Sequence, residues 1–195
     1  MNLTSAVIML FLIMDPLGNI SIFMTLLGKY DPPRRRFIII RESIIALVIL
    51  CLFLFLGQNL LSIFSISQPA LSISGGLVLF LIAIKMIFPI HEGGPFGKNP
   101  EGEPFIVPLA VPLIAGPSAL STVLIVVSKE PTRTFFWLTA IFIAWVLSTF
   151  ILFFSSAINK ALGPRLLEAI EKLMGLILTA IAVQMFINGM EMLRK

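Results

Sequence analysis

Two short segments combine a proline with residue types that carry charge or donate hydrogen bonds. Residues 15–19 read Asp-Pro-Leu-Gly-Asn, and residues 115–119 read Ala-Gly-Pro-Ser-Ala. Proline lacks a backbone donor and disfavours helical geometry at the residue before it. Asp15 and Gly116 are residue types that precede helices, and proline is common at the first helical position. Each segment therefore predicts the end of one helix and the start of another.

Both segments interrupt long apolar runs near their midpoints, 3–27 for the first and 105–128 for the second. A helix that starts there points its free N–H groups, equivalent to about half a positive charge, at mid-span. Such an end suits a carboxylate, and Asp15 suits an ammonium group, Na⁺ or H⁺. The alternative interpretation is a pair of ordinary proline kinks, because proline is frequent in membrane helices.

The candidate substrate site consists of the small and polar residues at the two breaks and two amides near the C-terminus. Gln184 and Asn188 lie one helical turn apart in an apolar run and are expected to face the centre of the protein. For the serines there is a competing interpretation, since serine in a membrane helix often bonds its own backbone. The full set is Asp15, Pro16, Gly18, Asn19, Gly116, Pro117, Ser118, Ala119, Ser121, Gln184 and Asn188.

Composition places these segments in a membrane. The chain has 195 residues, 58% of them apolar and 12% charged, whereas soluble domains have about 45–50% and about 25%. The mean hydropathy is +1.05. A transmembrane helix needs about 20 apolar residues, so the runs account for most of the chain and exclude a separate soluble domain. The six apolar runs are about 3–27, 37–57, 66–88, 105–128, 134–157 and 166–190.

The chain also contains an internal repeat. Residues 76–87 align with residues 175–186, with half of the positions identical, and the first run aligns with the fourth at the two breaks. The second and fifth runs show no convincing match. Two halves of three spans each have opposite orientations, as in many secondary transporters.

We therefore expect an all-α polytopic membrane protein with six transmembrane spans. The spans form two inverted three-helix repeats, and spans 1 and 4 are broken at mid-membrane. A single membrane domain covers 1–195, with repeat 1 at about 1–88, a loop at 89–104 and repeat 2 at about 105–195.

The basic residues predict the orientation, because cytoplasmic loops of membrane proteins are rich in Lys and Arg. With both termini on the outer, periplasmic side, most basic residues lie inside. The inner residues are Lys29, Arg34, Arg35, Arg36, Arg41, Lys85, Lys98, Lys160, Arg165 and Lys172, and the outer ones are Lys129, Arg133, Arg194 and Lys195. Since the net charge of +4 is concentrated in short loops, the lipid bilayer is the expected partner and nucleic acid is not.

The sequence shows no nucleophile–base motif, no phosphate-binding loop and no pair of acids within the spans, so an enzyme is not expected. His91 is the one histidine, which falls short of a metal ligand set. No metal and no cofactor are expected, with Na⁺ or H⁺ as the candidate coupling ion. A homo-oligomer is left open.

The two motifs, the chain length and the six spans together resemble the MarC family of bacterial and archaeal membrane proteins, over essentially the whole chain. The resemblance implies a neutral amino acid transporter of the cell inner membrane. It does not assign binding residues, so the placement of the substrate at the two breaks rests on the physical argument above.

The leading hypothesis is a secondary transporter that moves small neutral amino acids by alternating access, with its direction left open. One alternative is an exporter of drugs or other small metabolites, which a larger apolar cavity would favour. Another is a non-transporting membrane assembly factor. It predicts no buried polar cavity between the breaks and no effect of Asp15→Asn on function.

Overall fold

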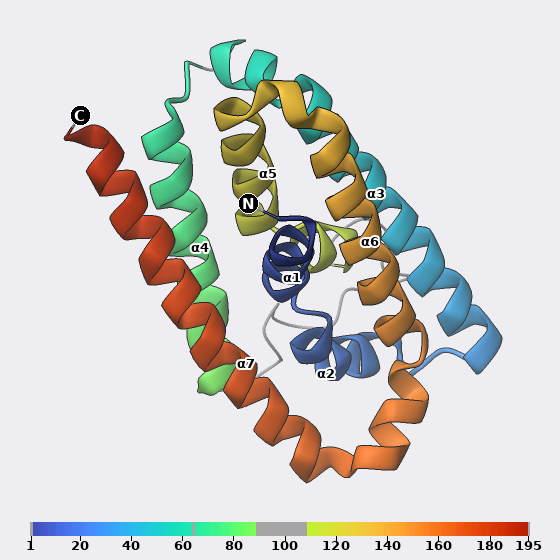
Figure 1. Cartoon of the computed structure of the whole chain (residues 1–195). Coiled ribbons are helices and arrows are strands. Elements are labelled where there is room, and N and C mark those ends of the chain that lie inside the picture. The colour runs from blue at the N-terminus through green and yellow to red at the C-terminus, as the bar shows by residue number, and fades with distance from the viewer. Residues whose placement is uncertain (1, 64, 89–108, 195) are drawn as a thin grey trace.

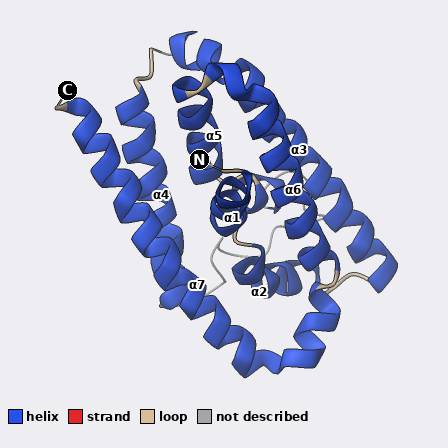
Figure 2. Cartoon of the chain, viewed as in Figure 1, coloured by secondary structure: helices blue, strands red, loops and turns tan. Residues whose placement is uncertain are grey.

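The computed structural model of the chain describes residues 2–63, 65–88 and 109–194 (Figure 1). These residues form helices joined by short connections, with no strand among them (Figure 2). The elements are α1 (Leu3–Met14), α2 (Pro16–Leu27), α3 (Pro32–Ile63), α4 (Gln68–Ile87), η1 (Leu109–Ile114), α5 (Pro117–Lys129), η2 (Pro131–Arg133), α6 (Thr134–Phe153) and α7 (Ser155–Leu193).

Within the described residues, five helical stretches are long and apolar enough to cross a membrane. They are Leu3–Leu27, which contains α1 and α2, followed by Pro32–Gly57, Gln68–Ile87, Thr134–Phe153 and Arg165–Leu193. The predicted run at 105–128 corresponds to the short segment η1 and the helix α5, whose apolar part Pro117–Ser128 is too short to span alone. Residues 105–108 and the predicted loop at 89–104 lie outside the described residues.

Several boundaries differ from the sequence-based expectation, and two helix starts differ most clearly. Helix α3 begins at Pro32, so the basic residues 34–36 lie in its first turns rather than in a turn before it, since proline is compatible with a helix start. The last helix begins at Ser155, earlier than predicted, and is interrupted at Gly163, where φ is 73° and ψ is 163°. Glycine adopts such a positive φ without steric cost.

Helices α4 and α7 pack along each other in opposite directions at one side of the molecule (Figure 1). They share a small apolar cluster of their own, whereas a larger core joins α1, α2, α3, α5 and α6. The α4–α7 cluster contains Leu79, Ala83, Met86, Met174, Leu178, Ala182 and Met185.

Glycines allow close contact at this α4–α7 seam. A Cβ atom at Gly76 would lie 2.8 Å from the carbonyl oxygen of Ala182, and one at Gly175 would lie 3.1 Å from the carbonyl oxygen of Ala83. A substitution at either glycine therefore pushes a side chain against the backbone of the other helix.

The outer surface of the helices is strongly apolar. Phe55, Leu81 and Phe150 expose 56%, 62% and 63% of their surface, and many other large apolar side chains are similarly open. Monomeric soluble proteins rarely expose apolar patches of this extent, so the surface fits the lipid environment that the composition predicts.

Candidate functional site

The first break lies between α1 and α2 and is built on Asp15. Its backbone has φ 44° and ψ 57°, a left-handed conformation that Asp tolerates better than most residues. Its N–H closes α1 by bonding the carbonyl oxygens of Phe11 and Leu12, each at 3.1 Å. Its carboxylate Oδ1 accepts the Gly18 N–H at 3.1 Å and so caps α2. The helix start predicted at Pro16 is therefore present.

The second break lies between η1 and α5. The Ala115 N–H bonds the Ala110 carbonyl at 2.8 Å and closes η1 with a wide turn. Gly116 is extended, with φ −69° and ψ 161°, and α5 starts at Pro117 as predicted. Gly116, at the N-cap position, gives α5 no side-chain hydrogen bond. Among the described residues, the N-terminus of α2 thus carries a capping carboxylate, and that of α5 does not.

Asn19 joins the two breaks. Its Nδ2 atom donates to the carbonyl oxygen of Met14 at 3.0 Å and to that of Leu113 at 3.1 Å. Because one nitrogen contacts both oxygens, the last turn of α1 and the last turn of η1 must be adjacent. Both carbonyls lie at helix ends, where the intrahelical partner is missing. The sequence pointed to Asn19 as a site residue but not to this bridge.

Gly18 is required by a close approach at the first break. A Cβ atom there would collide with Oδ2 of Asp15 and with the terminal methyl group of Met86. Met86 belongs to α4, so this helix also contacts the first break. Pro16 and Asn19 are buried as well.

The first turns of α5 are also buried and small. Ser118, Ala119 and Ser121 expose 3%, 0% and 2% of their surface. Ser121 lies against α4, where a Cβ atom at Gly75 would be 2.8 Å from the Ser121 Cβ. The structure therefore brings the residues of both breaks, together with α4, into one buried region.

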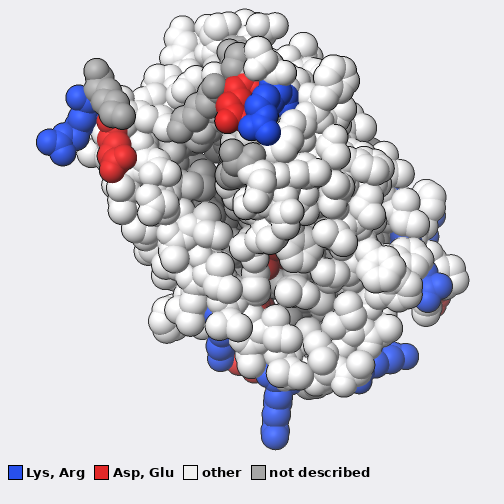
Figure 3. Space-filling view, viewed as in Figure 1, with Lys and Arg blue, Asp and Glu red and all other residues white. Residues whose placement is uncertain are grey.

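Asp15 lies between α1 and α2 and is buried, with 5% of its surface exposed. Few charged atoms show in the middle of the face drawn in Figure 3.

Glu171 of α7 was not among the predicted site residues, although it lies near this region. Helix α7 packs against α2, and this packing brings Glu171 near Ser21 of α2 and near Asp15. No local sequence signal identifies Glu171, because its place beside α2 depends on how α2 packs against α7.

Gln184 and Asn188 require a correction. Both are exposed on α7, and Gln184 Nε2 donates to Asn188 Oδ1 at 2.8 Å, so they bond each other and do not face the centre. The face of α7 that packs on α4 carries Leu178, Ala182 and Met185. Successive residues on a helix are rotated by about 100° around its axis. Gln184, which directly precedes Met185, therefore points away from α4, and Asn188, one turn later, points the same way.

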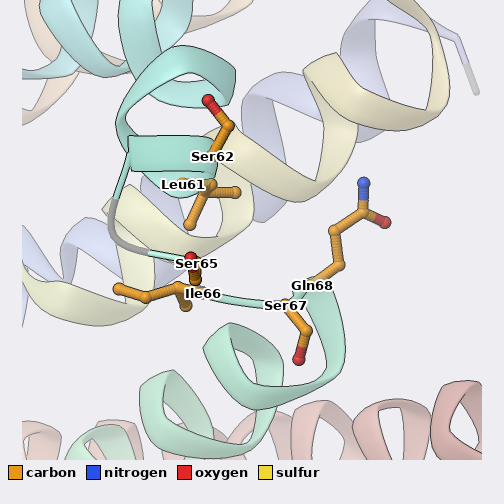
Figure 4. Close-up of a pocket in the computed structure, with 6 residues that line it drawn as sticks. All are labelled: Leu61, Ser62, Ser65, Ile66, Ser67 and Gln68. Carbon is orange, nitrogen blue, oxygen red and sulfur yellow. The ribbon is translucent and has the colours of Figure 1, made fainter.

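A pocket of about 330 Å³ lies at the connection between α3 and α4 (Figure 4). It is lined by Leu61, Ser62, Ser65, Ile66, Ser67 and Gln68. None of the predicted site residues lines it.

Comparison with known proteins identifies relatives along the whole chain. The model of the MarC family integral membrane proteins matches residues 1–194. The UPF0056 inner membrane protein YhgN of Escherichia coli (strain K12) is 46% identical over 194 residues, which are 100% of this chain and 98% of that protein. A UPF0056 membrane protein of Methanocaldococcus jannaschii is 32% identical over 187 residues, 92% of this chain and 91% of that protein.

No solved structure matches the chain. The match to the family model and the identity to relatives from bacteria and an archaeon cover nearly the full length. They agree with the apolar helices found by length and composition. The chain belongs to the MarC family of integral membrane proteins.

Proposed function

We propose that this protein is a secondary transporter of small neutral amino acids that works by alternating access. The observation that carries the proposal is the adjacency of two broken helices, joined by the Asn19 amide that contacts Met14 and Leu113. In secondary transporters, helices broken near the midplane bind substrate with their half-helix ends.

The two half-helix ends are electrostatically different, and this difference suits a zwitterion. The Asp15 carboxylate holds a negative charge at the α2 end, whereas the α5 end offers N–H groups without a side-chain cap. The substrate ammonium group is placed at Asp15, and the substrate carboxylate at the start of α5. A helix N-terminus attracts anions by its free N–H groups and its dipole.

Substrate size follows from the residues around the breaks. Gly18, Ser118 and Ala119 are small, and Asn19 and Ser121 are short and polar. They suit a small amino acid whose own side chain is uncharged, such as glycine, alanine, serine or threonine. A bulky drug requires a wider apolar site.

Alternating access needs two related halves, and the α4–α7 seam supports an inverted repeat. In the alignment of 76–87 with 175–186, Gly76 corresponds to Gly175 and Ala83 to Ala182. The contacts are reciprocal, since Gly76 lies against Ala182 and Gly175 against Ala83. Antiparallel helices with reciprocal contacts are what a two-fold axis in the membrane plane generates. We propose that six spans form two such inverted halves, and that α5 is the second part of the fourth span.

The charge distribution supports an orientation with both termini on the periplasmic side of the inner membrane. The α2–α3 and α6–α7 connections lie at one end of the molecule, and Lys and Arg side chains gather near that end (Figures 1 and 3). By the positive-inside rule this end is cytoplasmic. An inner-membrane location agrees with the name of the Escherichia coli relative.

The proposal is tested by flux in proteoliposomes. Purified protein is reconstituted, and uptake of labelled glycine, alanine, serine and threonine is measured with no gradient, with a Na⁺ gradient and with a pH gradient. We expect at least one of these amino acids to move faster than in protein-free liposomes, and one gradient to identify the coupling ion. No flux of any of them under all three conditions contradicts the proposal.

Asp15→Asn tests the role of the charge, because it removes the charge while the amide oxygen still caps α2. If transport of an amino acid is found and Asp15→Asn leaves it unchanged, the assignment of the ammonium group or coupling ion to Asp15 is wrong. Flux of larger apolar compounds alone indicates an exporter of drugs or metabolites.

A further inference from the structure

The exposed face of α7 carries a polar pair in an otherwise apolar surface. Gln184 and Asn188 are exposed, and among the described residues their hydrogen bond is with each other. Their neighbours on this face are apolar, with Leu173 58%, Val183 45% and Ile187 44% exposed.

The pair lies within the hydrocarbon layer if α7 spans the membrane. Residues 173–190 contain no charged side chain, and at 1.5 Å per residue they extend about 27 Å. This length is close to the thickness of the hydrocarbon core, about 30 Å. Gln184 is near the middle of the stretch, where no water is present to satisfy polar groups.

The single bond between the amides leaves most of their hydrogen-bonding capacity unused. Each amide has two N–H donors and an oxygen acceptor, and one donor of Gln184 and one acceptor position of Asn188 are occupied. Other exposed polar side chains behave differently. The Thr139 hydroxyl of α6 donates to its own helix at Phe135, 2.8 Å away, and the Ser74 hydroxyl of α4 donates to Leu71 at 3.1 Å.

We propose that this face of α7 is a homodimer interface, in which Gln184 and Asn188 bond the same residues of a second copy. Two copies inserted in the same orientation are related by an axis along the membrane normal, so their α7 helices run parallel. Each residue then meets its own equivalent at the same depth. An amide is both donor and acceptor and pairs with itself, and a buried Asn specifies register and oligomer state in coiled coils in this way.

The interface is independent of the proposed transport activity, since neither amide lies at the two breaks. Ala180, one turn before Gln184, is exposed on the same side and leaves room for close approach. Polar side chains that bond between helices, together with small residues, are characteristic of helix association in membranes.

The test uses the full-length protein in liposomes. Dye-labelled copies are reconstituted over a range of protein-to-lipid ratios, and single-molecule photobleaching gives the fraction of dimers. The double variant Gln184→Leu, Asn188→Leu is compared with Thr139→Leu, which removes an exposed polar group already bonded to its own helix. Leucine is compatible with a lipid-facing position, so both variants are expected to fold, as circular dichroism checks.

We expect the wild type and Thr139→Leu to dimerise alike, and the double variant to dimerise at least tenfold more weakly. An unchanged dimer fraction in the double variant overturns the proposal, and so does a wild type that stays monomeric at every ratio.

Cross-linking gives an independent measurement of geometry. Cys51 is the one cysteine of the chain, so single-cysteine variants are made in a Cys51→Ala background. Ala180→Cys, which leaves both amides in place, should form a disulfide-linked dimer in membranes several-fold more efficiently than Thr139→Cys. Equal efficiency at the two positions contradicts the interface, and a cross-link from position 180 to a different protein, with no homodimer, assigns this face to another partner.

Discussion

Asn19 donates a hydrogen bond of 3.1 Å to the carbonyl oxygen of Leu113, across 94 positions of the chain. The same amide nitrogen contacts Met14 at 3.0 Å. This one side chain therefore satisfies a carbonyl at the end of α1 and another at the end of η1. It holds the two helix breaks together, and the proposed substrate site depends on their adjacency.

Replacing Asn19 by Leu should destabilise the protein, because it leaves the Met14 and Leu113 carbonyls buried without a partner. Each unsatisfied buried group costs about 1–3 kcal/mol. We expect a clearly lower midpoint of thermal unfolding in detergent. Asn59→Leu is the control, since Asn59 is exposed at the end of α3 and should leave the midpoint nearly unchanged. Equal midpoints for the two variants would show that the bridge contributes nothing.

Two substitutions at Asp15 should separate its charge from its capping role. Asn accepts the Gly18 N–H and tolerates the left-handed backbone, so Asp15→Asn should unfold near the wild-type temperature but lose transport. Asp15→Ala removes the cap as well and should cost about 1 kcal/mol more. Thermal unfolding and proteoliposome flux measure the two effects. A similar loss of stability in both variants contradicts this separation.

Gly76→Ala and Gly175→Ala should have matching effects. Each added methyl group would press on the facing backbone, at 2.8 Å from the Ala182 oxygen and 3.1 Å from the Ala83 oxygen. Overpacking of this kind costs about 1–3 kcal/mol. Denaturation of both variants in the same detergent tests the symmetry, with Ala70→Val, at an exposed position of α4, as control. If only one glycine is sensitive, the reciprocal packing is not energetically equivalent.

Arg35→Lys should lower stability although the charge is kept. The Arg35 guanidinium donates to the Leu27 carbonyl at 3.1 Å, the Tyr30 carbonyl at 3.2 Å and the Ser156 hydroxyl at 2.8 Å. It thereby links the end of α2 to the start of α7. An ammonium group cannot reproduce this planar set of donors. We expect a loss of about 1–3 kcal/mol, against little change for the exposed Arg34→Lys. Equal unfolding curves for the two variants would contradict this role.

Membrane orientation is testable with single cysteines in a Cys51→Ala background. Ser67→Cys in the α3–α4 connection should react in intact cells with a maleimide that does not cross the inner membrane. Ala161→Cys, in the part of α7 before its interruption at Gly163, should react only after the membrane is opened. The reverse pattern would place the termini in the cytoplasm.

Local chemistry explains which features were predictable. The breaks at Pro16 and Pro117 follow from the covalent geometry of proline and its effect on the preceding residue, whatever the rest of the chain does. The membrane environment follows from composition. The outward direction of Gln184 was not predictable, because an apolar helix in lipid has no polar face to mark its exposed side.

The sequence by itself therefore determined the apolar helices, the two breaks, their capping residues and the family. Only the tertiary structure decided that Asn19 spans both breaks, that Glu171 approaches Asp15 and that Gln184 and Asn188 face outward. The physical reason is range. Proline, glycine and aspartate act on neighbouring residues through backbone geometry, whereas the partner of a side chain 94 positions away depends on how the helices pack.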